Sequence, residues 1–153
     1  EEHTMVELDK IDRVILNRLQ EDARKSFREI AKEAGVSEGT IFVRVKKLQE
    51  SGVIKGFRAV VNPELLGKKV TAFILMKVLP KMYRSVLEEL AKLDDVFEIY
   101  DVTGACYAIL RVYTQNTEQL ADLIDKIGTV EGITSTETAV VLRSIKQQSI
   151  IKV

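Results

Sequence analysis

The sequence predicts an α+β fold in which three short helices precede a domain of alternating strands and helices. Apolar residues recur at helical spacing up to residue 52, and strand-like and helix-like patterns alternate after residue 70. A turn signal, Asn62 followed by Pro63, falls between the two regions. The chain has 153 residues, 46% of them hydrophobic, which is enough for two small cores. We therefore expect a helical domain over residues 5–61, a linker over residues 62–69 and a second domain over residues 70–153.

Three apolar stripes define the helices of the first domain. The first stripe consists of Leu8, Ile11, Ile15 and Leu19. Asp9 and Asp12 fall in its first turn, where carboxylates suit the helix dipole. The second and third stripes are Phe27, Ile30, Ala31 and Ala34, then Ile41, Val45 and Leu48. Residues 1–4 precede Met5, a candidate natural start, so they are left out of the fold prediction, and His3 is assigned no role.

Three consecutive residues specify the break between the second and third helices. Gly35 can adopt a positive φ angle without a Cβ clash, and Val36 fills the corner. Ser37 is placed to cap the third helix by accepting a backbone N–H. Thr40 stands where Glu or Gln would complete a capping box, so that box is incomplete. Two helices joined by such a turn form a helix-turn-helix.

The third helix has a polar outward face when its apolar stripe points inward. That face, with the cap, consists of Ser37, Glu38, Gly39, Thr40, Val43, Arg44, Lys46 and Lys47. A helix in the major groove reads base edges with its N-terminal residues, while hydroxyl and basic groups hold phosphates. Glu38 could accept from a cytosine amino group, Val43 could touch a thymine methyl group, and Gly39 permits close approach. We therefore expect double-stranded DNA as a partner.

Structural alternatives exist for several of these residues. The helix pair could serve packing alone, with a basic surface solvated by water. Arg44 is expected to meet phosphate, and the alternative is an intramolecular pair with Glu38 or Glu50. Ser26 and the helix amides behind it could take a phosphate, or Ser26 could only cap its helix. The two lysines of the third helix could simply keep it soluble.

Composition excludes several classes of protein. Formal net charge is zero, so nucleic-acid binding has to come from a local patch. Residues 37–58 supply one, with five basic and two acidic residues and a net charge of plus three. Cys106 is the only cysteine, which excludes an internal disulfide and a cysteine metal site within one chain, and its apolar strand context predicts a core position. No apolar run approaches the roughly 20 residues of a membrane span, so we expect a soluble cytoplasmic protein without metal, cofactor or membrane partner.

Residues 70–153 alternate between strand and helix patterns. We expect strands at residues 70–79, 96–103, 105–114 and 133–145, with helices at residues 82–93 and from the Asn116 cap to Ile127. Gly104 makes the turn between the second and third strands. This order of elements is that of the ferredoxin-like split βαβ arrangement.

The first of these strands predicts a dimer. Residues 72–79 are apolar on both faces, with Lys77 as the one exception. Two helices can cover only one face of a four-stranded sheet, so the other face would expose more apolar surface than a monomer usually tolerates. A second subunit is the simplest cover. Two recognition helices roughly 34 Å apart could then read paired half-sites.

These features together resemble the leucine-responsive regulatory protein/AsnC family, also called feast/famine regulators. The matching segments span nearly the whole chain in the family's order, from Leu-Asp-Lys-Ile-Asp-Arg-Val-Ile-Leu at residues 8–16 through residues 19–24, 29–31, 37–48, 52–54, 62–63, 103–104 and 132–142. The resemblance implies a transcription regulator with a winged or plain helix-turn-helix domain. It also implies a second domain that dimerises, assembles further to an octamer or other higher oligomer, and senses small metabolites.

The resemblance also implies where an amino acid effector would bind, which is between dimers near the turn after the second strand. Carried over by position, the effector-binding residues are Tyr100, Asp101, Thr103, Gly104, Ala105, Cys106 and Tyr107, with Thr134, Ser135 and Thr136 nearby. Many relatives have a Gly-Asp-x-Asp pattern there, whereas this chain reads Gly-Ala-Cys-Tyr, so a carboxylate for a ligand ammonium group is missing. Three alternatives stay open: Asp101 substitutes, the effector is not a simple amino acid, or none binds.

A sequence-specific regulator is the leading function, and the alternative is an architectural protein that bends DNA with little base readout. Some proteins similar to this family decarboxylate tetrapyrroles with the help of histidine. His3 is the only histidine of this chain, and it lies outside both expected domains. No nucleophile-elbow, phosphate-loop or zinc pattern occurs either, so we expect no enzyme activity.

Overall fold

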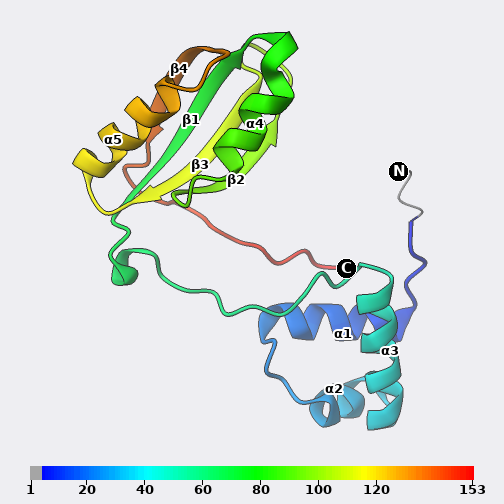
Figure 1. The fold of residues 1–153 in the computed structure, drawn as a ribbon. Coiled ribbons are helices and arrows are strands. Elements are labelled where there is room, and N and C mark those ends of the chain that lie inside the picture. The colour runs from blue at the N-terminus through cyan, green and yellow to red at the C-terminus, as the bar shows by residue number, and fades with distance from the viewer. Residues whose placement is uncertain (1–4) are drawn as a thin grey trace. The chain divides into compact units, whose positions relative to one another are not determined.

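The computed structural model describes residues 5–153 and confirms the α+β fold (Figure 1). The expectations for residues 1–4, including His3, lie outside the described part. The chain forms two compact units, one made of residues up to 60 with residues 146–153, the other of residues 61–145. Residues 146–153 thus belong with the helices, whereas the domain prediction put them with the sheet. Within the described residues, every helix is too short or too polar to cross a membrane.

Three helices form the first unit: α1 (Lys10–Glu21), α2 (Phe27–Ala34) and α3 (Glu38–Glu50). The predicted stripes meet in one core, whose buried members are Ile15, Leu16, Leu19, Ile30, Ala31, Ile41, Val45 and Leu48. Burying a Val, Leu or Ile side chain contributes about 1.5–3 kcal/mol, so the seven of them in this core are the main force that holds the three helices together. Gly35 has a φ angle of 70°, which confirms the predicted turn.

Side-chain caps set where each of these helices begins. Asp9 caps α1, and the Asp12 side chain returns to the Asp9 backbone N–H at 3.1 Å, which completes a capping box. Ser26 and Glu29 form a second box at the start of α2. Ser37 caps α3 alone, since Thr40 supplies no carboxylate, as predicted.

The second unit is an antiparallel sheet with two helices, in the ferredoxin-like order. Its strands are β1 (Val70–Val78), β2 (Val96–Asp101), β3 (Ala108–Thr114) and β4 (Ile133–Val140), and they lie in the order β2-β3-β1-β4. The helices are α4 (Tyr83–Ala91) and α5 (Thr117–Gly128), and short 3-10 turns occur at Glu64–Leu66 and Pro80–Met82. The last strand ends at Val140, opposite Ala72 of β1, rather than at residue 145.

Both helices pack on one face of the sheet (Figure 1). The inward residues of β1 alternate with outward ones, so Ile74 and Met76 are buried whereas Phe73 is 36% exposed. The outward face also carries apolar side chains from β2 and β3, and Phe97 of β2 is 52% exposed beside the Tyr113 ring, with 4.7 Å between ring centroids. One subunit alone therefore leaves the outward face of the sheet open.

Candidate nucleic-acid interface and effector region

The outward face of α3 is open to solvent in the described structure. Glu38, Gly39, Val43, Lys46 and Lys47 are exposed, and so is the Ser37 cap, whereas Thr40 and Arg44 are half-buried. Within residues 5–153, no carboxylate lies within ion-pair distance of either lysine. Both charges are therefore available to an external anion.

Gly39 is not required by the fold. It is the second residue of α3, and an added Cβ would meet only the Ser37 Oγ at 4.0 Å. Glycine destabilises a helix interior by about 0.5–1 kcal/mol relative to alanine, and a first-turn position such as this one by less. The missing side chain leaves the backbone of α3 bare on its exposed face, where a duplex could approach closely.

Arg44 is held inside the unit. Its guanidinium bonds to the carboxylate of Asp9 and lies 3.3 Å from that of Asp12, both on the N-terminal turn of α1. The structure thus shows an intramolecular pair, but its partners are Asp9 and Asp12 rather than Glu38 or Glu50. The backbone N–H of Asp12, followed by the Arg44 guanidinium, lowers the pKa of Asp9 to about 2.

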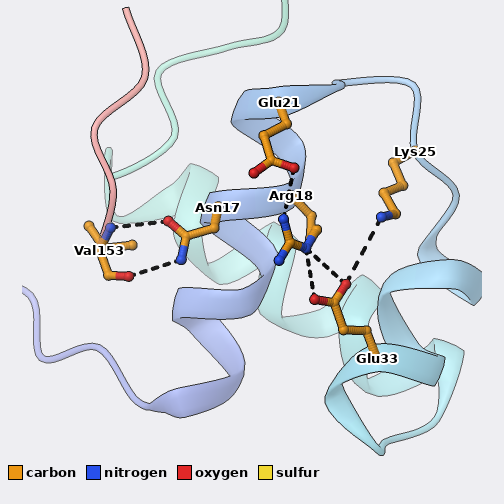
Figure 2. A network of polar contacts seen from close by, with 6 residues as sticks. All are labelled: Asn17, Arg18, Glu21, Lys25, Glu33 and Val153. Atoms are coloured by element: carbon orange, nitrogen blue, oxygen red, sulfur yellow. Dashed lines mark hydrogen bonds and ion pairs between the residues drawn. The ribbon is translucent and has the colours of Figure 1, made fainter.

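A second polar network joins α1 to α2 (Figure 2). The Nε of Arg18 donates to both carboxylate oxygens of Glu33, at 2.8 and 2.9 Å, and its Nη1 donates to Glu21 at 2.7 Å. Lys25 approaches the same Glu33 carboxylate at 4.0 Å. Glu33 and then Glu21 raise the pKa of Arg18. Together with the Arg44 pairs, this network fixes α2 and α3 against α1 and so sets the angle at which α3 is presented.

Ser26 acts as a cap in the structure. Its Oγ accepts from the Glu29 backbone N–H at 3.1 Å, and its own N–H donates to the Glu29 carboxylate at 3.2 Å. Its amide is therefore occupied, and the exposed hydroxyl keeps its own hydrogen free to donate. A phosphate contact by this hydroxyl remains a prediction.

Phe42 is a candidate contact that the sequence reasoning missed. It lies on α3, is 59% exposed, and its ring meets that of Phe27 edge-on with 6.4 Å between centroids. Position 42 falls outside the inward stripe of Ile41 and Val45, which is the signal that could have identified it. With Val43, it makes the exposed surface of α3 partly apolar.

The expected effector region surrounds the loop between β2 and β3. The Tyr83 hydroxyl of α4 lies 2.5 Å from the Asp101 carboxylate and 3.0 Å from the Tyr107 carbonyl oxygen. Burial, and then the hydrogen bond to Asp101, raises the pKa of Tyr83 to about 12. Tyr100 donates to Glu98, which raises the pKa of Tyr100. The carboxylate of Asp101 is thus already engaged, and Tyr83 is a member of this region that sequence reasoning missed.

The other positions of the predicted effector site are spread across the sheet. Thr103, Gly104, Ala105 and Cys106 lie in the loop that precedes β3. Cys106 is half-buried there, rather than on a strand in the core as predicted, because β3 begins only at Ala108. Thr134, Ser135 and Thr136 are exposed on β4, at the opposite edge of the sheet.

The distance across the sheet separates these two groups within one chain. Asp101 pairs with Ala108, Ala108 with Met76 and Met76 with Thr136, so one row crosses all four strands. Three strand spacings amount to about 14 Å. Within a single subunit, the width of the sheet thus separates residues 134–136 from Asp101, and their joint role in one effector site stays a prediction. The described residues also contain no cluster of three or more metal-ligating side chains.

Comparison with known proteins identifies both units. Residues 8–55 match the winged helix-turn-helix DNA-binding family, and residues 71–151 match the Lrp/AsnC ligand binding domain. The chain belongs to the Lrp/AsnC family. An HTH-type transcriptional regulator of this kind from Pyrococcus abyssi, FL11, is 44% identical over 142 residues, which cover 93% of this chain and 94% of FL11. Ptr1 of Methanocaldococcus jannaschii, another HTH-type transcriptional regulator, is 40% identical over 143 residues, 93% of this chain and 97% of Ptr1.

Two solved structures share this architecture. The structure of AsnC from E. coli is 39% identical, covers 95% of this chain and 99% of that one, and superimposes with a TM-score of 0.90. The L-Met complex of the transcriptional regulator NMB0573 from Neisseria meningitidis has the same fold at 22% identity, with a TM-score of 0.90 over 95% of this chain and 96% of that one. The predicted family and fold, and the function as a helix-turn-helix transcription regulator with an effector domain, are confirmed.

Proposed function

We propose that this Lrp/AsnC regulator reads a DNA duplex with the exposed N-terminal half of α3. The observation that carries the proposal is the combination of a bare backbone at Gly39 with the uncompensated charges of Lys46 and Lys47. Glu38 and Thr40 lie at base edges, where a carboxylate favours cytosine and a hydroxyl tolerates several bases. The two lysines hold phosphates, and the Ser26 and Ser37 hydroxyls add neutral phosphate contacts.

Arg44 has a different role in this proposal. Its guanidinium is shared between Asp9 and Asp12, so moving it to a phosphate would leave the buried Asp12 carboxylate without its cationic partner. Arg44 therefore positions α3 on α1. A phosphate contact, as expected from the sequence, is the alternative role of Arg44. The Arg44→Ala substitution distinguishes the two roles.

The open face of the sheet pairs two copies of the chain in this proposal. Phe73, Leu75, Ile109 and Tyr113 point outward from the two central strands, and Phe97 extends the apolar surface to β2. A two-fold axis through this face would cover it in both copies and would present two α3 helices to paired half-sites. Assembly above the dimer remains a prediction.

An effector would then bind between subunits. Asp101 and residues 134–136 lie at opposite sheet edges, so in this proposal they contribute to one site from different copies. The L-Met complex of the distant structural relative supports an amino acid as the chemical class to test first. Because Asp101 already accepts from Tyr83, a ligand ammonium group would have to share this carboxylate with the phenol.

Selection of bound sequences from a random duplex pool tests the proposed function. We expect a consensus of two half-sites about one helical turn apart, and a change in binding or assembly with one member of a panel of free amino acids. The Asp101→Asn variant should lose the response to that amino acid and keep the consensus. A ratio of specific to non-specific affinity near one would overturn sequence-specific reading and favour an architectural role.

A further inference from the structure

The outer side of α1 carries two side-chain amides that hold a segment from the far end of the sequence. Asn17 donates to the Val153 carbonyl oxygen at 2.9 Å and accepts from the Val153 N–H at 3.1 Å (Figure 2). Gln20, one helical turn away, donates to the Ile151 carbonyl oxygen at 2.7 Å and accepts from the Ile151 N–H at 2.8 Å. The four hydrogen bonds involve no charged side chain.

The pattern is the one by which a strand recognises its neighbour. In an extended chain, every second residue points both its N–H and its C=O towards the same edge of the chain. A primary amide has one donor group and one acceptor side by side, so it satisfies both groups of such a residue at once. Asn17 and Gln20 meet residues 153 and 151, which are two apart, and α1 thus takes the place of a neighbouring strand.

Apolar and charged side chains surround these amides. A cavity of about 780 Å³ is bordered by Leu16 and Leu19 of α1, by residues 53–58 and 60, and by Ser149, Ile151 and Val153. The Ile151 side chain is nevertheless 73% exposed. Main-chain hydrogen bonds therefore hold the segment more than its side chains do.

We propose that this face of α1 is a binding site for an extended peptide segment, and that its occupant is the chain's own residues 149–153. Residues 141–148 connect that segment to β4, while residues 61–69 connect the helices to β1. The docked segment is thus a second connection between the helical unit and the sheet unit. This connection narrows the range of orientations that α3 can adopt.

Amide hydrogen exchange in the full-length protein tests the site directly. The N–H groups of Ile151 and Val153 should be protected in the wild type, and the Asn17→Asp, Gln20→Glu double variant should increase their exchange at least tenfold. A carboxylate keeps the shape of the amide but cannot donate to the carbonyl oxygens, and its negative charge repels them, so the segment leaves α1 although the carboxylate can still accept from an N–H group. Gln148→Glu, a charge change on the exposed residue just before the segment, is the matched control and should leave protection intact. Unprotected N–H groups in the wild type would overturn the proposal.

A disulfide identifies whose segment occupies the site. In a Cys106→Ser background, the Asn17→Cys, Val153→Cys variant retains the Gln20 contacts and should oxidise to a product that runs as a single chain on a denaturing gel. A product of two linked chains would show that the segment comes from a second copy, which overturns the assignment of the occupant.

The effect on DNA rests on the proposed function. In the double variant, affinity for a duplex with paired half-sites should fall about tenfold, while affinity for one half-site stays within twofold, because the restraint acts through effective concentration. Equal affinity of variant and wild type for the paired duplex would refute the restraint. Absence of DNA binding by the wild type would refute the proposed function, and the exchange and disulfide results would still decide the peptide site.

Discussion

The guanidinium of Arg44 on α3 lies 3.3 Å from the carboxylate of Asp12 on α1, and it also bonds to Asp9, the residue that caps α1. The helix proposed to read DNA is thus tied to the first turn of the helix behind it. Asp12 is buried, whereas Asp9 is exposed. Loss of the ion pair would therefore leave a costly unpaired charge at Asp12 but not at Asp9. This difference makes the role of Arg44 testable.

Replacing Arg44 should affect folding more than the salt dependence of DNA binding. Arg44→Ala leaves the buried Asp12 carboxylate without its ion-pair partner, and we expect a loss of about 1–3 kcal/mol in the free energy of unfolding, measured with urea. Lys47→Ala should leave stability unchanged and lower the slope of log affinity against log salt by about one. If Arg44→Ala instead has normal stability and a reduced slope of log affinity against log salt, Arg44 contacts a phosphate.

The capping carboxylate of Asp9 predicts a specific acid sensitivity. Its pKa is lowered from 3.8 to about 2 in the folded chain, so its contribution to stability is present above pH 3.8 and is lost as the pH falls towards 2. The Asp9→Asn variant should therefore show a smaller loss of stability between pH 5 and pH 2.5 than the wild type, by urea unfolding. Asp125→Asn, an exposed acid on α5, is the control. Parallel pH profiles for Asp9→Asn and wild type would contradict the assignment.

Replacing Gly39 should have opposite effects on folding stability and on DNA affinity. Gly39→Ala should raise the free energy of unfolding by up to about 0.5 kcal/mol, because alanine favours the first turn of the helix and its Cβ meets nothing closer than 4.0 Å. The same methyl group should weaken DNA binding at least tenfold by keeping the duplex away from the backbone. Gly128→Ala, at the end of α5 with nothing within 4 Å, is the matched control and should leave DNA affinity unchanged. Full affinity of Gly39→Ala would exclude close approach at this position.

The apolar pair on α3 predicts recognition of methyl groups. Phe42 and Val43 are 59% and 50% exposed, and a thymine methyl group is the apolar feature of the major groove. Replacing thymine by deoxyuridine, one position at a time in the selected duplex, should weaken binding at one or two positions in each half-site. Those losses should disappear in a Phe42→Ala, Val43→Ala variant. If no deoxyuridine position changes the wild-type affinity, the pair reads no methyl group.

The open face of the sheet predicts a charge-sensitive dimer. Phe73→Glu places a carboxylate at the centre of that face, and we expect sedimentation equilibrium to show monomers at concentrations where the wild type is dimeric. Arg84→Glu, on the exposed side of α4, reverses a charge elsewhere and should leave the dimer intact. Dimers of Phe73→Glu would place the interface elsewhere.

Local patterns in the sequence were sufficient for the helices, the turn and the order of helices and strands along the chain. The stripe at Ile41, Val45 and Leu48 predicts which side of α3 is buried, and the need for a positive φ angle at Gly35 predicts the break before it. Each of these features depends on residues within one or two helical turns. Periodicity and backbone sterics therefore express them without knowledge of the rest of the chain.

Contacts between distant residues were decided only by the tertiary structure. Arg44 is 32 residues from Asp12, Asn17 is 136 residues from Val153, and the order β2-β3-β1-β4 alone puts Asp101 and Thr136 at opposite edges. Such pairings depend on which elements pack together and in which register. Neither the packing partner nor the register can be recognised from the spacing of residues along the chain. The partners of Arg44 and the docking of residues 149–153 therefore appear only when the chain is folded.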